Sequence, residues 1–223
     1  MDSLGPYLLG PNDTPENGIY TGDARELAKA IPDESIDLIF TDPVYDKIDD
    51  YKWLAETGAR VLIEGGNLIA QTGQYYLPQV ISGMDGSLDY VWVIAEHQFG
   101  RAFPLFKHRI LCHWKPYLWY SKGKRQGEWV FDWIKGGMGD KKHHAWGNSP
   151  HMFIDLISKL SNDDRTTFDP FTGGGTVPAV CKMLNRKYLA FEIDPDVAQM
   201  ARDRVRHTQP PLPIEMPTQE VLL

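Results

Sequence analysis

The chain contains a glycine-rich turn that indicates its architecture, and this turn reads Asp169-Pro170-Phe171-Thr172-Gly173-Gly174-Gly175-Thr176. Apolar patterning places a short strand before it, at Thr166 to Phe168, and a helix after it that ends near Leu184. Glycines at such a junction let the backbone approach a ligand at the carboxyl edge of a parallel sheet. Taken alone, the turn is equally compatible with a tight structural connection between a strand and a helix.

An acidic residue after the next predicted strand favours a nucleoside ligand. That strand runs from Tyr188 to Phe191, and Glu192 follows it. In nucleotide-binding α/β folds, an acid about 20 residues beyond the glycines accepts hydrogen bonds from ribose hydroxyls. No lysine follows the glycines directly, which argues against a P-loop that grips phosphate.

Outward from this turn, short apolar runs alternate with helical patterns, which predicts an α/β domain with a mainly parallel sheet. Gly65-Gly66 is predicted to end the helix that precedes it. Pro116 is predicted to split the segment 109–121, which then forms a strand pair or a bent hairpin. We expect the other strands at 18–21, 36–40, 67–71 and 90–95, the other helices at 24–30, 51–62, 75–84, 150–160 and 195–206, and an irregular insertion at 123–149.

A second motif, Thr41-Asp42-Pro43-Val44-Tyr45, follows the buried apolar strand predicted at 36–40. An acid, a rigid proline and an aromatic at one strand end form a plausible catalytic corner. Asp42 can hydrogen-bond an amino group, Pro43 constrains the backbone, and Tyr45 can stack on a planar base. A turn with a capping aspartate explains the same residues without chemistry.

Length and composition favour a single globular domain spanning residues 1–223. The chain is 42% hydrophobic, and it contains no run of 18 apolar residues, so we expect no membrane span. The N-terminus does not resemble a secretory signal, and Cys112 and Cys181 lie far apart, so a cytoplasmic location is expected. The proline-rich stretch 209–223 is predicted to be a flexible tail.

The charge is distributed unevenly along the chain. The net charge is −7, yet the stretch from His97 to His144 contains ten lysines and arginines and only three acids. Because phosphate binding depends on a local basic surface, we interpret 97–148 as an insertion that recognises nucleic acid; a solvated basic loop is the alternative. The residues expected to contact DNA phosphates are Lys122, Lys124, Arg125, Lys141 and Lys142.

Asp42-Pro43-Val44-Tyr45 resembles the D-P-P-Y motif of methyltransferases that act on adenine N6 or cytosine N4. Asp169 to Thr176 resembles the D-P-F-x-G-x-G-T cofactor loop of the same enzymes, and the run from Tyr20 to Pro43 resembles their entry segment. The catalytic motif precedes the cofactor loop, with the basic stretch between them. This circularly permuted order resembles the β group of DNA amino-methyltransferases, over about Gly18 to Val205.

The resemblance implies a seven-stranded, Rossmann-like methyltransferase sheet with helices on both faces. It also implies S-adenosylmethionine as cofactor, double-stranded DNA as partner, and a homodimer as a candidate assembly. It makes Asp42, Pro43 and Tyr45 the base-binding, catalytic corner. The cofactor-binding residues that it implies are Asp169, Phe171, Gly173, Gly175 and Thr176 in the loop, Glu192 on the ribose, and Asp23 near the cofactor adenine.

Two departures from the family pattern stand out. Val44 replaces the second proline of the catalytic motif, and Ser149 replaces a lysine in the stretch before the helix that precedes the cofactor loop. An aspartate at the start of the catalytic motif favours adenine N6. Three alternatives stay open: cytosine N4 as the target, RNA or protein as the substrate, and a DNA-binding relative without activity. We expect no metal, because the histidines and cysteines lack paired zinc-ligand spacing.

Overall fold

The computed structural model describes residues 14, 17–98, 102–125, 128–136 and 150–209. Its main sheet has eight strands, in which only β7 runs antiparallel to its neighbours. Their order across the sheet is β1 (Asn17–Thr21), β10 (Lys187–Glu192), β9 (Thr166–Asp169), β2 (Ile36–Thr41), β3 (Leu62–Gln71), β7 (Trp114–Ser121), β4 (Asp89–His97) and β8 (Trp133–Lys135).

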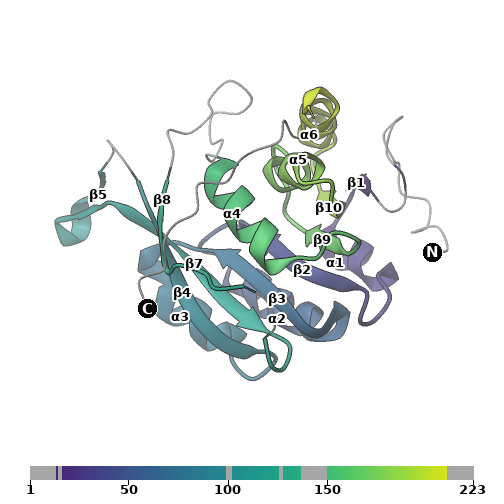
Figure 1. Cartoon of the computed structure of the whole chain (residues 1–223). Helices are drawn as coiled ribbons and strands as arrows, with labels where there is room; N and C mark the ends of the chain where they lie inside the picture. The colour runs from purple at the N-terminus through teal and green to yellow at the C-terminus, as the bar shows by residue number, and fades with distance from the viewer. Residues whose placement is uncertain (1–13, 15–16, 99–101, 126–127, 137–149, 210–223) are drawn as a thin grey trace.

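Helices cover both faces of this sheet (Figure 1). One face packs against α1 (Ala24–Leu27) with the 3-10 turn η1 (Ala28–Ala30), α2 (Ile48–Val61), and α3 (Leu77–Met84), which follows the 3-10 turn η2 (Gln74–Tyr76). The other face packs against α4 (Pro150–Leu160), α5 (Thr176–Met183) and α6 (Pro195–His207). Each face has its own core of buried aliphatic and aromatic side chains, as a doubly wound sheet requires.

The predicted fold class, a mainly parallel α/β sheet of the methyltransferase type, is confirmed. The sheet has one strand more than the seven expected, because Trp133 to Lys135 pairs in parallel with the end of β4. This strand comes from the stretch predicted to be irregular, where its three residues are too few to give a periodic signal. No helix of the described residues is long and apolar enough to cross a membrane.

The prediction that Gly65-Gly66 ends a helix is wrong. Helix α2 ends at Val61, and β3 begins at Leu62 and runs through both glycines. The glycines allow an irregularity in the pairing with β2, whose register shifts between Ile36 and Leu38. A Cβ on Gly66 would lie 2.9 Å from the Ile63 carbonyl oxygen, so a side chain does not fit there.

The prediction that Pro116 splits its segment is also wrong. Pro116 lies inside β7, opposite Ala95 of β4. The Ala95 amide donates to the Asp132 carbonyl at 2.7 Å, on the side away from β7, and the Pro116 carbonyl accepts from the Thr72 amide at 3.0 Å. Ala95 and Pro116 are thus a pair that exchanges no backbone hydrogen bond. The N–H that Pro116 lacks therefore removes no hydrogen bond between β4 and β7.

The β4–β7 hairpin continues beyond the sheet as a small second sheet. It consists of β5 (Phe103–Leu105), the 3-10 turn η3 (Phe106–His108) and β6 (Ile110–Cys112). Figure 1 shows β5 projecting away from the main body.

Strand order identifies one edge of the sheet as the place for a ligand. The chain continues from β9 to β10 on one side and from β2 to β3 on the other, so β9 and β2 are the neighbours at which the strand order reverses. In open α/β sheets, ligands bind outside the carboxyl ends of the strands at such a switch point. Asp169 ends β9 and Asp42 follows β2, so the two sequence motifs meet at this position.

Candidate functional site

Glu192 organises the carboxyl edge of the sheet between β1 and β10. Its backbone carbonyl accepts from the Gly22 amide at 2.9 Å. One side-chain oxygen accepts from the Gly173 amide at 2.9 Å and the other from the Asp194 amide at 3.0 Å. Each carboxylate oxygen has further acceptor capacity, so this half-buried side chain can hold the glycine loop and still accept from a ligand hydroxyl.

Asp23 lies on the neighbouring strand end, directly after Gly22. Its side chain caps α1 by accepting from the Arg25 amide at 2.7 Å, and it is exposed to solvent. Because Thr21 pairs with Glu192 in the sheet, Asp23 and Glu192 extend from adjacent strand ends. The structure thus brings together the two acids predicted for opposite ends of one nucleoside.

The glycines of the loop have different surroundings. Gly173 has φ of +47°, and a Cβ built on it meets nothing within 4 Å. Gly175 has φ of +75°, and a Cβ there would lie 2.9 Å from that of Ala201 on α6. The Thr176 hydroxyl accepts from Arg204 of α6 at 2.8 Å. Gly173 therefore borders open space, whereas Gly175 and Thr176 fix the loop against α6.

We expect Gly173→Ala and Gly175→Ala to separate binding from stability. Gly175→Ala should lower the free energy of unfolding by about 2 kcal/mol, because its methyl group overpacks against α6. Gly173→Ala should cost about 1 kcal/mol of left-handed strain and should weaken cofactor binding more, because its methyl group enters the open space. Urea unfolding and calorimetric titration with S-adenosylmethionine measure the two effects, and equal stability losses in both variants would contradict the distinction.

Phe171 contributes an apolar wall beside the loop. Its ring meets Trp53 of α2 edge-on, with ring centroids 5.7 Å apart. The guanidinium of Arg25 lies over the Trp53 ring, 5.5 Å from its centroid, and forms an ion pair with Asp50 at 2.7 Å. Side chains of α1 and α2 thereby hold Phe171 in place next to the glycine loop.

Asp169 links the two motifs directly. Its Oδ1 accepts from the Thr41 hydroxyl at 2.7 Å and from the Phe171 amide at 3.3 Å. Burial raises the pKa of this carboxyl to about 7, against the hydrogen bonds from Thr41 and Phe171, which lower it. Thr41 immediately precedes Asp42, so the hydrogen bond holds the Asp42–Tyr45 motif next to the glycine-rich loop.

The corner itself combines exposed and buried residues. Pro43 is buried, whereas Asp42 and Val44 are exposed, Val44 by 63%. The Lys47 amide donates to the Val44 carbonyl at 3.0 Å and closes a turn. This turn restrains the loop at the position where the family pattern has its second proline.

Tyr45 is held by a polar network that the sequence did not reveal. Its ring packs on Gly73, and its hydroxyl accepts from Gln71 at the end of β3. Gln71 in turn accepts from the Tyr117 hydroxyl at 2.5 Å, and Tyr117 contacts Glu96 at 3.1 Å. Burial and the neighbouring Asp42 carboxylate raise the pKa of Tyr45, so it stays neutral.

Glu96 completes this network as a buried carboxyl group. Burial raises its pKa, against Lys115 and the hydrogen bond from Tyr117, which lower it. The single hydroxyl proton of Tyr117 cannot serve both Gln71 and Glu96 at once. Gln71 and Glu96 therefore compete for the Tyr117 hydroxyl proton at the buried end of the network.

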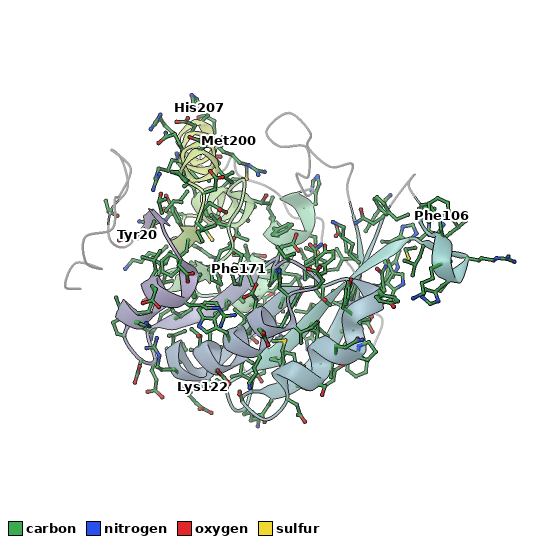
Figure 2. All side chains as sticks on the ribbon, turned by 180° about the vertical axis from the view of Figure 1, so that it is seen from behind. Tyr20, Phe106, Lys122, Phe171, Met200 and His207 are labelled. Atoms are coloured by element: carbon green, nitrogen blue, oxygen red, sulfur yellow. The ribbon has the colours of Figure 1, made fainter. Side chains whose placement is uncertain are left out.

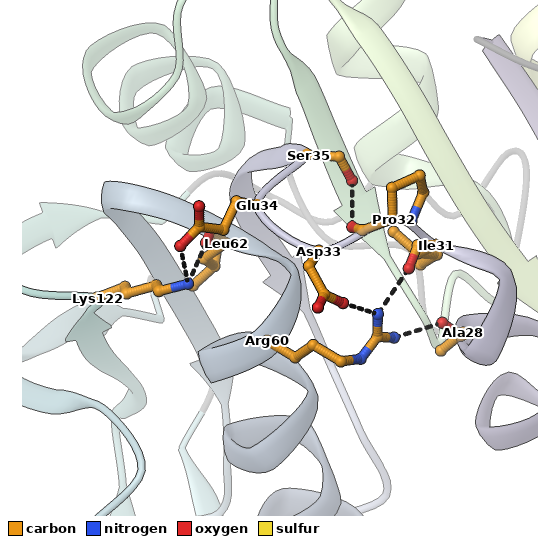
Figure 3. Close-up of polar contacts among 9 residues, drawn as sticks. All are labelled: Ala28, Ile31, Pro32, Asp33, Glu34, Ser35, Arg60, Leu62 and Lys122. Carbon is orange, nitrogen blue, oxygen red and sulfur yellow. Dashed lines mark hydrogen bonds and ion pairs between the residues drawn. The ribbon is translucent and has the colours of Figure 1, made fainter.

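The residues predicted to contact DNA lie apart from this edge or outside the described residues. Lys122 follows β7 at the opposite edge of the sheet, where its ammonium binds Glu34 at 3.1 Å and the Leu62 carbonyl at 2.9 Å (Figure 3). Lys124 is exposed two residues later. Arg125 stacks on Trp119 at 4.6 Å, and burial lowers its pKa. The geometry does not favour Lys122 as a phosphate contact; Lys141, Lys142 and Ser149 lie outside the described residues.

A doubly wound sheet with a glycine-rich loop and the Asp42 motif at its switch point has the architecture of the methyltransferase class. The chain belongs to the N6/N4 DNA methylase family, whose model, described as DNA methylase, matches residues 36–203. This confirms the predicted family.

Individual relatives agree with this assignment. The chain is 26% identical to the type II methyltransferase M.BamHI of Bacillus amyloliquefaciens, over 86% of this chain and 57% of that protein, so it spans little more than half of this relative. The cytosine-N4-specific PvuII DNA methyltransferase has a similar fold, with a TM-score of 0.77 and 17% identity over 86% of this chain and 87% of that one. An M1.HpyAVI–SAM complex aligns with a TM-score of 0.69 and 21% identity, over 84% and 98% of the two chains.

Proposed function

We propose that the chain transfers the methyl group of S-adenosylmethionine to adenine N6 in double-stranded DNA. The observation that carries this proposal is the 2.7 Å hydrogen bond from Thr41 to Asp169. It joins the strand that leads to Asp42 with the strand that leads to the glycine loop. A base bound at the Asp42 corner, as methyl acceptor, and a cofactor bound at the glycine loop, as methyl donor, would therefore lie side by side at the switch point.

The residues of the loop fit the cofactor. Glu192 retains acceptor capacity for ribose hydroxyls, Gly173 borders open space, and Phe171 supplies an apolar wall. Asp169 would bind at the methionine end and Asp23 near the adenine. Gly175 and Thr176, which we expected to bind the cofactor, would support the loop from the side of α6.

The chemistry at the corner follows from hydrogen bonding. S-adenosylmethionine supplies an electrophilic methyl group on a sulfonium. The amino nitrogen of a base is a poor nucleophile because its lone pair is delocalised into the ring. The Asp42 carboxylate and the Pro43 carbonyl would each accept a hydrogen bond from this amino group and favour a tetrahedral nitrogen. One amino proton would pass to Asp42 or to water as the methyl group is transferred, and positioning would supply much of the rate. Tyr45 would stack on the base, worth about 1–3 kcal/mol.

The choice of adenine rests on the aspartate that begins the corner motif, since cytosine-N4 enzymes of the family more often begin with serine. Incubation of unmethylated duplex DNA with the protein and cofactor, followed by mass spectrometry of the nucleosides, tests this choice. N6-methyladenine is the expected product. N4-methylcytosine would replace our proposal by the cytosine alternative, and methylation of RNA or protein alone would exclude DNA as the substrate.

We expect the stability of the cofactor-free protein to fall as the pH rises between about 4 and about 7. The folded pKa of Asp169, about 7, lies above the ordinary value of 3.8, so the folded state binds more protons than the unfolded state in this window. The loss should reach up to about 4 kcal/mol and should disappear in Asp169→Asn. Urea unfolding across this range measures it, and parallel pH profiles of wild type and variant would refute it.

We expect Gln71→Leu to lower kcat about tenfold with little change in cofactor affinity, because the Tyr45 hydroxyl loses its donor. The decisive comparison is a double-mutant cycle with Tyr45→Phe. If Gln71 acts through that hydroxyl, Gln71→Leu should have little further effect on kcat in the Tyr45→Phe background. Additive losses would mean that Gln71 acts on the site by another route.

A further inference from the structure

The β5–β6 extension, which we call the arm and define as Phe103–Cys112, has no role in the site described above. It continues the β4–β7 hairpin, and the Gln98 amide donates to the His113 carbonyl at 2.6 Å where the arm begins. Strand β4 runs in the same direction as β3, because β7 is antiparallel to both. The arm therefore emerges from the carboxyl edge of the sheet, the edge that holds Asp42 and the glycine loop.

The tip of the arm presents apolar side chains to solvent. Phe106 is 84% exposed, and Phe103, Ile110 and Leu111 are also exposed. Each strand of the arm has only three residues, so these side chains have no core of their own to enter. Figure 2 shows Phe106 at the outer end of the arm, well separated from Lys122. Such exposed apolar surface on a projecting element indicates a binding partner.

The charge of the arm identifies the chemistry of that partner. Lys107, His108 and Arg109 follow Phe106 directly, and the sequence contains no acid between Gln98 and Gly127. The whole chain, in contrast, carries a net charge of −7. An aromatic tip flanked by cations complements a polyanion that also offers apolar surface, and stacked bases between two phosphate backbones provide both.

Contacts place the arm beside the catalytic corner. The His108 ring lies 5.5 Å from that of Tyr75 in η2, and the side chain of Gln74 in the same turn donates to the Trp114 carbonyl at the start of β7. Gly73, just before this turn, packs against the ring of Tyr45. One short turn thus contacts the arm on one side and Tyr45 on the other.

We propose that the arm inserts Phe106 into the DNA duplex next to the target nucleotide, with Lys107 and Arg109 on the flanking phosphates. A base that enters the corner must leave the helix, which costs a few kcal/mol and leaves a gap in the stack. An aromatic ring that fills this gap stacks on the neighbouring bases and offsets part of that cost, and apolar side chains are known to enter the base stack of DNA from a bound protein. The inference rests on the proposed function, because it assumes a base that is moved out of the duplex.

The test measures binding to two duplexes of the same sequence, one intact and one with a single abasic site, which presents the gap without base flipping. Wild type should bind the abasic duplex at least tenfold more tightly, and Phe106→Ala should lose this preference. Lys107→Ala with Arg109→Ala should weaken binding to both duplexes equally and flatten the salt dependence. Tyr90→Ala is the matched control, since Tyr90 is an exposed aromatic at the opposite end of β4.

The second readout is the rate of methylation of an unmethylated duplex, prepared by copying the DNA with a polymerase. Phe106→Ala should lower this rate at least tenfold. A wild type without preference for the abasic duplex, or a Phe106→Ala variant that keeps it, would overturn the proposal. A change from dimer to monomer in Phe106→Ala without loss of the preference would instead make the arm an interface between copies. If wild type prefers the abasic duplex but methylates no DNA, the proposed function fails while the wedge stands.

Discussion

Asp42→Ala should reduce methyl transfer by about 100- to 1000-fold and leave the affinity for S-adenosylmethionine within a few-fold of wild type. The alanine removes the carboxylate that would accept an amino proton in the transition state, and removing one such group costs about 3–4 kcal/mol. Asp42 directly follows β2, and the hydrogen bond to Asp169 at the start of the glycine loop comes from Thr41. Radiolabel transfer to duplex DNA and calorimetric titration measure the two quantities.

Asp46→Ala is the matched control, because Asp46 is an exposed carboxylate in the same loop. It should change the rate by less than about threefold, a difference below 1 kcal/mol. Asp42→Asn retains one acceptor oxygen and should lie between the alanine variant and wild type. Equal losses in Asp42→Ala and Asp46→Ala would show that the loop needs its charge rather than an acceptor at one position.

The sequence predicted the edge of the sheet that carries the site because local signals specify it. Asp42 and Asp169 each follow a short apolar strand, and the glycines after Asp169 mark the strand-to-helix turn. The carboxyl ends of parallel strands all lie at one edge of the sheet, so these positions could be placed at the same edge without predicting which strands pair. Strand and helix types were therefore predicted well around both motifs, and the structure confirms the mainly parallel sheet.

Long-range contacts had no such signal. The bond from Thr41 to Asp169 joins residues 128 positions apart, and the network from Tyr45 through Gln71 to Glu96 crosses three strands. The direction of β7 explains the other difference. Because β7 is antiparallel, Lys122 at its end lies at the edge opposite Asp42, although the basic segment is continuous in the sequence. The distribution of charge along the sequence does not specify at which edge of the sheet a basic residue such as Lys122 lies.

Glu192→Ala should weaken binding of S-adenosylmethionine at least about 100-fold. The alanine removes acceptors for the ribose hydroxyls, and hydrogen bonds to a charged group contribute about 1.5–3 kcal/mol. It also releases the Gly173 amide, which the carboxylate holds at 2.9 Å, so the loop loses a restraint where the cofactor would bind. Calorimetric titration of the folded variants gives the affinity, and Glu192→Gln should retain part of it.

Asp194→Ala distinguishes this role from a structural one. Asp194 is a carboxylate two residues away that also accepts from two amides, those of Asp196 and Val197, but it caps α6 instead of holding the glycine loop. Losing that cap should cost about 1 kcal/mol of stability. Cofactor affinity in Asp194→Ala should stay within a few-fold of wild type, because both Glu192 oxygens and the Gly173 contact remain. If both variants lose affinity in proportion to their loss of stability, Glu192 supports the fold and does not bind the ribose.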